Sequence, residues 1–250
     1  MEAIENINVT APKMKVEVWS DIICPFCYIG KRQYEAALQQ FADSNNVEII
    51  WKSFQLDPSI PDNVEKGLTS VQYLASRKGI SAEQVHAMHG QVVQMAKNAG
   101  LAYNLDHAVV YNSFKAHRII QLAKTKGLGD AAEETFFHAH FIQNKDLGDV
   151  DILASLGKEI GLSEAEVNDA LTNEDYAHKV KQDILEAQQI GVSGVPFFVF
   201  NRKYAVSGAQ PVGAFLQTLE RSFAEWRKDN PVSTLEITGG SVCTPDGECN

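Results

Sequence analysis

The sequence predicts an α/β fold in which a small sheet is interrupted by a large all-helical insertion. Three observations support this prediction: a strand–helix–strand pattern over residues 14–54, helical periodicity from about Gly67 to Gly191, and a return to strand patterning at Val195. Because a single helix joins the first two strands, we expect them to pair in parallel through a right-handed crossover. A chain of 250 residues, 44% of them hydrophobic, is long enough to bury such a core.

The first part of the chain carries the strand–helix–strand unit. Apolar and other residues alternate over residues 14–19, which is typical of a strand, and Tyr34, Leu38 and Phe41 then recur at helical spacing. A second β-rich run covers residues 47–54 and is followed by proline-containing turns.

The insertion is expected to hold roughly six or seven helices. Capping-box patterns at Ser81 to Gln84 and Ser163 to Glu166 indicate two helix starts. Five glycines are expected to end helices: Gly79, Gly100, Gly127, Gly161 and Gly191. One apolar stripe is expected to pack in the core: Val85, Met88, Val92, Met95 and Ala99.

The last part of the chain returns to the sheet. Residues 195–200 predict a strand that Pro196 must begin, because proline cannot donate a hydrogen bond within a sheet, and residues 204–206 predict its hairpin partner. Apolar residues then fall on one helical face from Val212 to Trp226, so this helix is expected to cover the sheet.

These elements define the expected domains. Residues 14–62 and 192–229 form one discontinuous domain, and residues 63–191 form the inserted helical domain. Residues 1–13 are expected to be a flexible N-terminal segment, and residues 230–250 a tail that carries a second pair of cysteines.

Composition excludes some classes of function. The formal net charge of −10 argues against nucleic acid or an anionic membrane as the main partner, because both require a basic surface. The first residues include Glu2 and Glu5 and contain no apolar block, so no secretory signal is predicted, and no apolar run approaches membrane-spanning length. We therefore expect a cytoplasmic protein, in which cysteine pairs are more often catalytic or metal-binding than structural.

The motif Cys24-Pro25-Phe26-Cys27 lies where the first strand ends and the first helix begins. Pro25 suits the first helical position, where its missing N–H costs nothing. The unpaired amides and the helix dipole favour a negatively charged sulfur at Cys24. Cys27 lies one turn deeper on the core-facing side, as expected for a thiol that resolves a mixed disulfide formed at Cys24.

Zinc binding and chance proximity are the alternative interpretations of this pair. The other two cysteines, Cys243 and Cys249, have five residues between them in a polar tail, which does not suit a structural zinc site. His86 and His89 share a predicted helical face, but no third ligand is evident. No metal site is therefore expected.

The order of the elements resembles the DsbA-like branch of the thioredoxin fold, over residues 14 to about 228. Three separate segments are similar to its FrnE-type subgroup: Ser20–Gly30, Asn112–Arg118 and Gly194–Phe200. The fold class implied is a thioredoxin-like fold with a large all-helical insertion.

This resemblance implies roles for several residues. Pro196 is expected to follow a cis peptide bond and to face the active cysteines, so that Val195 offers its backbone to an extended substrate. Pro25 and Phe26, between the cysteines, are also expected to contact substrate. In the insertion, the resemblance places three residues near the active-site groove: Asn112, His117 and Arg118.

Two positions depart from better-known relatives. Phe26 stands where strongly oxidising members have histidine, so a milder oxidant is expected. Val18 stands where thioredoxin-fold enzymes commonly keep a buried acid, and Glu17 should point to the opposite face of the strand. Asp21 is either a substitute proton relay to Cys27 or a simple turn or capping residue.

The tail pair has three open interpretations. Cys243 and Cys249 flank a Pro-Asp-Gly turn sequence, so a second disulfide is feasible. FrnE-like proteins also carry an extra C-terminal cysteine pair, which implies electron exchange with Cys24 and Cys27. A passive disulfide and metal-binding thiols are the alternatives.

The function expected from these residues and from the resemblance is thiol–disulfide oxidoreductase chemistry, as reductase, isomerase or oxidase of protein disulfides, with no bound cofactor. Glutathione as co-substrate, or a thioredoxin-type dithiol protein, is the expected recycling partner. A glutathione-dependent isomerase or kappa-class-like transferase is the first alternative, although those relatives generally have serine at the first active-site position. The second alternative is a metal-stress thiol-binding protein.

Overall fold

The computed structural model describes residues 12–64 and 67–231; nearly all of the predicted N-terminal segment and the tail, with both tail cysteines, lie outside these ranges. Its centre is a four-stranded sheet of order β2-β1-β3-β4. β1 pairs in parallel with β2, whereas β3 runs antiparallel to both β1 and β4. The strands are β1 (Met14–Ser20), β2 (Val47–Ser53), β3 (Phe197–Phe200) and β4 (Tyr204–Ser207). The predicted parallel unit and hairpin are therefore confirmed.

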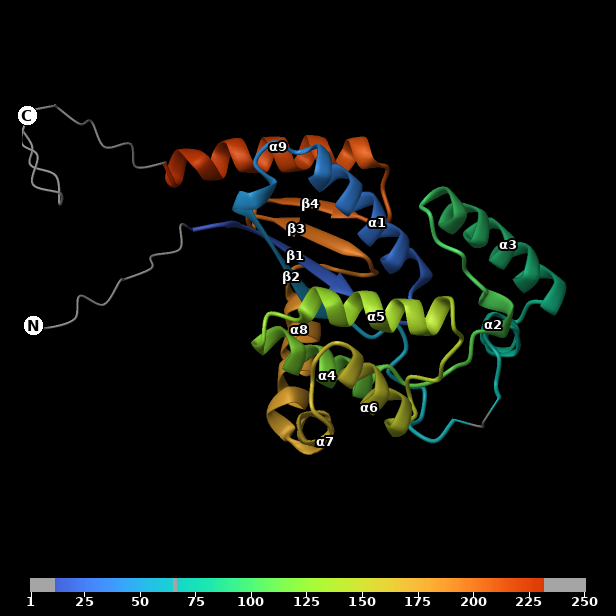
Figure 1. The fold of residues 1–250 in the computed structure, drawn as a ribbon. Coiled ribbons are helices and arrows are strands. Elements are labelled where there is room, and N and C mark those ends of the chain that lie inside the picture. The colour runs from blue at the N-terminus through green and yellow to red at the C-terminus, as the bar shows by residue number, and fades with distance from the viewer. Residues whose placement is uncertain (1–11, 65–66, 232–250) are drawn as a thin grey trace, which may run out of the picture.

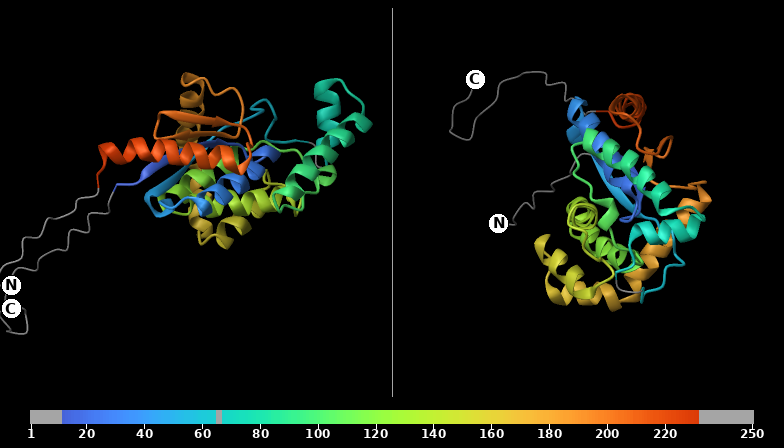
Figure 2. Two further views of the ribbon diagram at one scale, coloured as in Figure 1. Left: turned by 90° about the horizontal axis from the view of Figure 1, so that it is seen from above. Right: turned by 90° about the vertical axis from the view of Figure 1, so that its right-hand side faces the viewer.

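Helices cover both faces of the sheet (Figures 1 and 2). Helices α1 (Pro25–Gln40) and α9 (Val212–Asp229) pack on one face, where Val16 and Val18 meet Phe215. Helix α8 (Glu174–Gln189) packs on the other face, beneath Trp19. The remaining helices complete the insertion: α2 (Ser70–Lys78), α3 (Ala82–Asn98), α4 (Phe114–Thr125), α5 (Gly129–Phe141), α6 (Val150–Glu159) and α7 (Glu164–Thr172).

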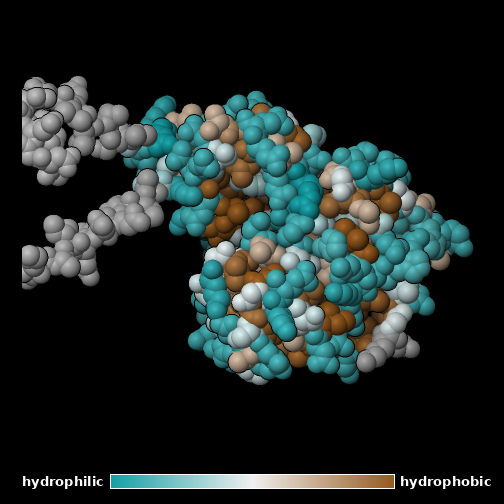
Figure 3. Space-filling model, viewed as in Figure 1, coloured by the Kyte–Doolittle hydropathy of each residue, from teal (hydrophilic) through white to brown (hydrophobic). Residues whose placement is uncertain are grey.

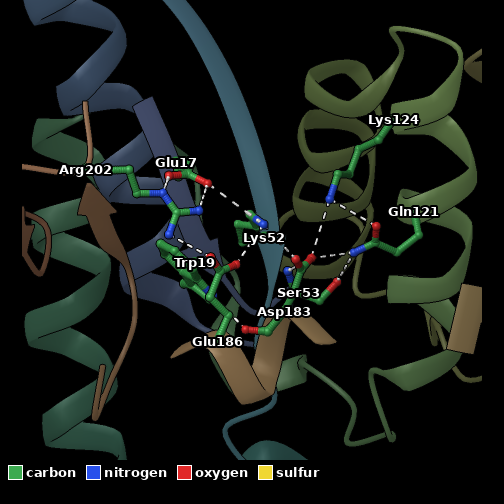
Figure 4. A network of polar contacts seen from close by, with 9 residues as sticks. All are labelled: Glu17, Trp19, Lys52, Ser53, Gln121, Lys124, Asp183, Glu186 and Arg202. Carbon is green, nitrogen blue, oxygen red and sulfur yellow. Dashed lines mark hydrogen bonds and ion pairs between the residues drawn. The ribbon is translucent and has the colours of Figure 1, made fainter. Parts of the chain in front are cut away.

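A network of charged and polar side chains fastens the insertion to the sheet (Figure 4). Asp183 on α8 accepts hydrogen bonds from the Ser53 N–H at 3.0 Å and from the Gln121 amide of α4 at 2.6 Å. Lys52 of β2 contacts Asp183 at 3.1 Å and Glu186 at 2.9 Å. Because strands and inserted helices share these buried partners, the network fixes α4 and α8 relative to the sheet. Its further members are Glu17, Trp19, Lys124 and Arg202.

The second anchor is a buried cation on α1. Lys31 is almost fully buried and contacts Glu134 of α5 at 3.0 Å and Asp130 of α5 at 3.4 Å, with Glu35 as its partner on the same helix. A buried ammonium needs such partners, because an unpaired charge away from water is costly. The active-site helix is thereby held against the insertion.

Local start and stop signals of the insertion are largely confirmed. Ser81 and Ser163 form complete capping boxes, and Gly79 and Gly191 follow their helices with φ of 64° and 79°. Between β2 and β3 the described residues form seven α-helices.

The predicted core stripe of α3 is wrong in part. Met88 and Met95 are 41% and 42% exposed, whereas Val85, His89 and Ala96 are buried. The buried side of α3 is therefore rotated relative to the apolar stripe, and it includes His89, which contacts Asp106 at 2.8 Å. Sequence periodicity alone did not show that a histidine would occupy this contact.

Candidate active site

Cys24 is the N-cap residue of α1, and Pro25 occupies the first turn as predicted. The Cys24 N–H donates to the Asp21 carbonyl at 2.9 Å, which closes the turn between β1 and α1. The N-cap position places Cys24 at the helix N-terminus, where unpaired amides and the helix dipole favour negative charge. The side chain is nonetheless 3% exposed, so a reacting partner must reach it through a defined opening.

Cys27 lies in the first turn of α1 and is 1% exposed. Burial raises its pKa well above the ordinary value, and the hydrogen bond and negative charge of Cys24 act in the same direction. Contacts from the Asp21 backbone and the Ser20 hydroxyl oppose this rise but do not offset it. Cys27 is therefore held as a neutral thiol next to Cys24.

The strand that begins with Pro196 lies directly opposite Cys24. The Val195-Pro196 bond is cis, which confirms the expectation drawn from the resemblance. The Cys24 thiol donates to the Val195 carbonyl, with 3.4 Å between Sγ and O. The two segments, far apart in the sequence, thus form one site.

Gly30 allows this close approach of α1 to the Pro196 loop. A Cβ at Gly30 would lie 2.9 Å from Cγ of Pro196, a distance at which the loop must shift. We expect Gly30→Ala to cost about 1–3 kcal/mol of stability and to lower the exchange rate. Urea unfolding and a disulfide-reduction assay would measure both effects.

The control for this variant is Gly90→Ala on α3, where an added Cβ meets nothing within 4 Å. It should stabilise the helix by about 0.5–1 kcal/mol and leave exchange unchanged. An unaffected Gly30→Ala protein would show that the contact with Pro196 is not needed.

A cavity of about 590 Å³ opens beside Cys24. Its wall brings together the predicted residues Cys24, Pro25, Phe26 and Val195, and Phe26 is 38% exposed there. The remaining wall comes from the loop after β2, from α2 and α3, from residues 105–111 and from the end of α5. Hydrophobic surface is visible next to α2 and α3 in Figure 3.

The three candidates from the insertion do not line this cavity. Asn112 donates to the Ile60 carbonyl and accepts from the Phe114 N–H at 2.9 Å, so it organises the start of α4. Arg118 donates to the backbone carbonyls of Ala170 at 2.8 Å and Asn173 at 2.9 Å, which ties α4 to the end of α7.

His117, the third candidate, is fully buried behind the active-site turn, where its Nε2 lies 3.3 Å from Oδ1 of Asp21. The Asp21 carboxylate also accepts from the N–H groups of Leu56 at 2.7 Å and Ile23 at 3.4 Å. Asp21 therefore stabilises the turn between β1 and α1, and its contact with His117 links this turn to α4.

Several residues at the site carry no local sequence signal. The Tyr103 hydroxyl donates to the Pro25 carbonyl at 2.7 Å, and burial together with the nearby cysteine sulfurs raises its pKa. Tyr111 and His140 line the inner wall of the cavity. These residues lie in a loop or on a mostly buried helix, so only tertiary packing brings them to Cys24.

The remaining candidates lie elsewhere. His86 and His89 both contact Oδ1 of Asp106, at 3.1 and 2.8 Å. Cys243 and Cys249 lie outside the described residues. None of the described helices is long and apolar enough to cross a membrane.

The comparisons with known proteins agree with this geometry. The crystal structure of a probable DsbA oxidoreductase from Streptomyces coelicolor is 35% identical, covers 95% of this chain and 98% of its own, and superposes with a TM-score of 0.79. The cytosolic disulfide reductase DsbM from Pseudomonas aeruginosa, solved with glutathione, shares the fold at 16% identity, with 86% and 98% coverage and a TM-score of 0.58. The Bacillus subtilis protein YwbO is 27% identical over 187 residues, which is 74% of this chain and 85% of YwbO. Residues 15–220 match the DSBA-like thioredoxin domain model, and the chain therefore belongs to this family.

Proposed function

We propose that this protein is a cytoplasmic thiol–disulfide oxidoreductase of protein disulfides, with Cys24 as nucleophile and Cys27 as resolving thiol. The observation that carries the proposal is the 3.4 Å contact between Cys24 Sγ and the Val195 carbonyl, with Cys27 one turn behind. This arrangement places a reactive sulfur next to a backbone segment that can bind an extended chain.

The reaction proceeds through two exchanges. The Cys24 thiolate attacks one sulfur of the substrate disulfide, the substrate S–S bond breaks, and the first substrate thiolate leaves with its electron pair. Cys27 then loses its proton to solvent or to a neighbouring base and attacks Cys24 Sγ, which releases the second substrate thiolate. Substrate gains two electrons and the protein ends with a Cys24–Cys27 disulfide; the reverse sequence oxidises a substrate dithiol.

Glutathione or a dithiol protein would return the pair to the reduced state. DsbM is a cytosolic disulfide reductase solved with glutathione. Its similar fold supports glutathione as the reductant and a cytoplasmic location. We also assign the chain to the FrnE-type subgroup, on the motif segments Ser20–Gly30, Asn112–Arg118 and Gly194–Phe200. In this proposal Cys243 and Cys249 exchange electrons with the first pair.

Disulfide chemistry is preferred to the isomerase or transferase alternative because cysteines occupy both positions, Cys24 at the N-cap of α1 and Cys27 in its first turn. In addition, the segment 207–210 lacks the acidic residue that glutathione-dependent relatives place near the γ-glutamyl amine.

The test is equilibration of the protein against glutathione buffers, with mass spectrometry to identify which cysteines pair. We expect a Cys24–Cys27 disulfide that forms and breaks reversibly, and catalysed reduction of insulin well above the uncatalysed rate. A midpoint potential that changes after truncation at Asn230 would support the role of the tail pair. Absence of a reversible Cys24–Cys27 disulfide would contradict the proposed function.

A further inference from the structure

The cavity beside Cys24 has the size and wall of a ligand site. Its volume of about 590 Å³ lies in the range of about 300–1,000 Å³ that is usual for small-molecule sites. Much of its wall is apolar and comes from the loop after β2, from α2 and α3, and from the end of α5: Leu56, Ile60, Leu74, Met88, Val92 and Phe141.

Two buried polar side chains on this wall are without partners. The Tyr111 hydroxyl and Nδ1 of His140 have no hydrogen-bond partner among the described residues, although both side chains are almost fully buried. Burial raises the pKa of Tyr111 and lowers that of His140 to about 4, so both are neutral at pH 7. The inner end of the cavity therefore carries no charge at pH 7, which suits the apolar body of a ligand rather than a charged group.

The charges at the cavity favour an anion. Among the described residues that line it, the cations Arg77 and Lys78 of α2 outnumber the one carboxylate, Asp57. Arg77 forms an ion pair with Asp57, whereas Lys78 has no ion-pair partner among the described residues. A local excess of positive charge is notable on a chain whose formal net charge is −10.

We propose that this cavity binds a small amphipathic disulfide, with an aromatic apolar body and one anionic group near Lys78, and presents its sulfur to Cys24. The inference rests on the proposed function, because it uses the same nucleophile. It names a second substrate class beside protein disulfides. Glutathione disulfide, which is polar and highly charged, matches the apolar wall poorly.

The reaction consumes no external oxidant. The Cys24 thiolate attacks one sulfur of the ligand, its S–S bond breaks, and one ligand thiolate leaves. Cys27 loses its proton and attacks Cys24 Sγ, which expels the second thiolate. Two electrons pass from the protein dithiol to the ligand, and one reduced protein releases two thiols.

Binding is tested first with dyes that do not react. The probes are 1-anilinonaphthalene-8-sulfonate, an aromatic anion, and neutral N-phenyl-1-naphthylamine. Lys78→Gln is expected to weaken binding of the anionic dye about fivefold, the effect of one partly exposed charge, and to change the neutral dye less than about twofold. Val92→Trp, which fills the cavity, is expected to weaken both at least about tenfold.

A matched control separates cavity filling from the addition of a tryptophan. Leu185 lies on α8, is highly exposed and does not line the cavity, so Leu185→Trp should leave both dyes unchanged. Circular dichroism and thermal melting establish that each variant is folded. Equal effects of Val92→Trp and Leu185→Trp, or unchanged dye binding in Val92→Trp, would overturn the inference.

Turnover is tested by single-turnover stopped flow, in a Cys243→Ser/Cys249→Ser background so that only the first pair reacts. The substrates are 5,5′-dithiobis(2-nitrobenzoate), which is anionic, and neutral 4,4′-dithiodipyridine, with glutathione disulfide for comparison. Two chromophoric products should appear per protein, the nitrothiobenzoate thiolate from the first compound and 4-thiopyridone from the second. Lys78→Gln should raise the half-saturating concentration about fivefold for the anionic compound alone. Equal effects on both aromatic disulfides would contradict a charge contact at Lys78.

Insulin reduction distinguishes the two proposals. If Val92→Trp keeps insulin reduction within about twofold while the aromatic disulfides lose at least about tenfold, the cavity is a small-molecule site. A parallel loss would show that the cavity receives a side chain of the polypeptide, and the inference would fail. If wild-type protein reduces neither substrate yet binds the dyes as expected, the proposed function fails and the binding site stands.

Discussion

Replacing Cys24 with serine is expected to abolish disulfide exchange, with a loss of at least about a thousandfold in the rate of insulin reduction. The hydroxyl of serine is not ionised near neutral pH, so no nucleophile remains beside the Val195 carbonyl. Cys27 cannot take over, because it is 1% exposed and burial raises its pKa. The measurement is the initial rate with dithiothreitol as reductant, corrected for the uncatalysed reaction.

Cys27→Ser should behave differently from Cys24→Ser. The first attack remains, but the mixed disulfide cannot be resolved from within the protein, so it accumulates and is visible on non-reducing gels. The matched control is Cys243→Ser/Cys249→Ser, which keeps the first pair and should retain insulin reduction. Mixed disulfides at Cys27 in the Cys24→Ser protein would reverse the assignment of nucleophile and resolving thiol.

The second large effect is expected from Glu133, a buried carboxyl on α5. Burial raises its pKa to about 7; Asp130 and Asp21 add to the rise, whereas His117 and Lys31 oppose it. In the unfolded chain the carboxyl titrates near its ordinary value of 4.5. Between pH 4.5 and pH 7 the carboxyl is ionised in the unfolded chain but protonated in the folded protein. The contribution of the protonated Glu133 to the free energy of unfolding is therefore fully present below pH 4.5 and is lost as the pH rises to 7.

The predicted loss of stability between pH 4.5 and pH 7 is about 3 kcal/mol. Glu133→Gln removes this dependence, because the amide does not ionise, so the difference between variant and wild type should grow by that amount over the same range. Urea unfolding at pH 5, 6, 7 and 8 measures it. Glu220→Gln on the exposed side of α9 is the control, and parallel profiles for wild type and Glu133→Gln would contradict a protonated carboxyl.

The surroundings of Cys27 differ from those of its counterparts in better-known relatives. Cys27 must lose a proton during resolution, and Val18 offers no acid at the position where relatives commonly have one. The structure places the buried Asp21, His117 and Glu133 behind the active-site turn. His117 was expected at a substrate groove, and its burial makes it a better candidate for holding Asp21 in place than for touching substrate.

Local patterns were sufficient for much of the fold. The strand at 14–20, the first turn at Cys24 and the capping boxes at Ser81 and Ser163 depend on residues within one or two turns of each other. These patterns involve residues that are close in the sequence and that contact each other locally, so they could be recognised without a structure.

The apolar stripe on α3 is an element whose burial the sequence pattern did not predict correctly. Its apolar residues satisfied the helical period, yet Met88 and Val92 line the cavity and Met95 is exposed. Periodicity indicates which side of a helix is apolar, but it does not indicate whether protein, solvent or a ligand faces that side.

The amino-acid sequence, together with its resemblance to DsbA-like proteins, was therefore enough to locate the Cys24–Cys27 pair at the start of α1 and the proline strand opposite it. The size, lining and charge of the cavity depended on tertiary packing, because its wall is assembled from α1, α2, α3, α5 and two loops that are distant in the chain. Burial of Arg118 against the end of α7 also depended on tertiary packing. The residue types of the site can be read directly from the sequence, whereas the cavity forms only when segments that are distant in the chain pack together.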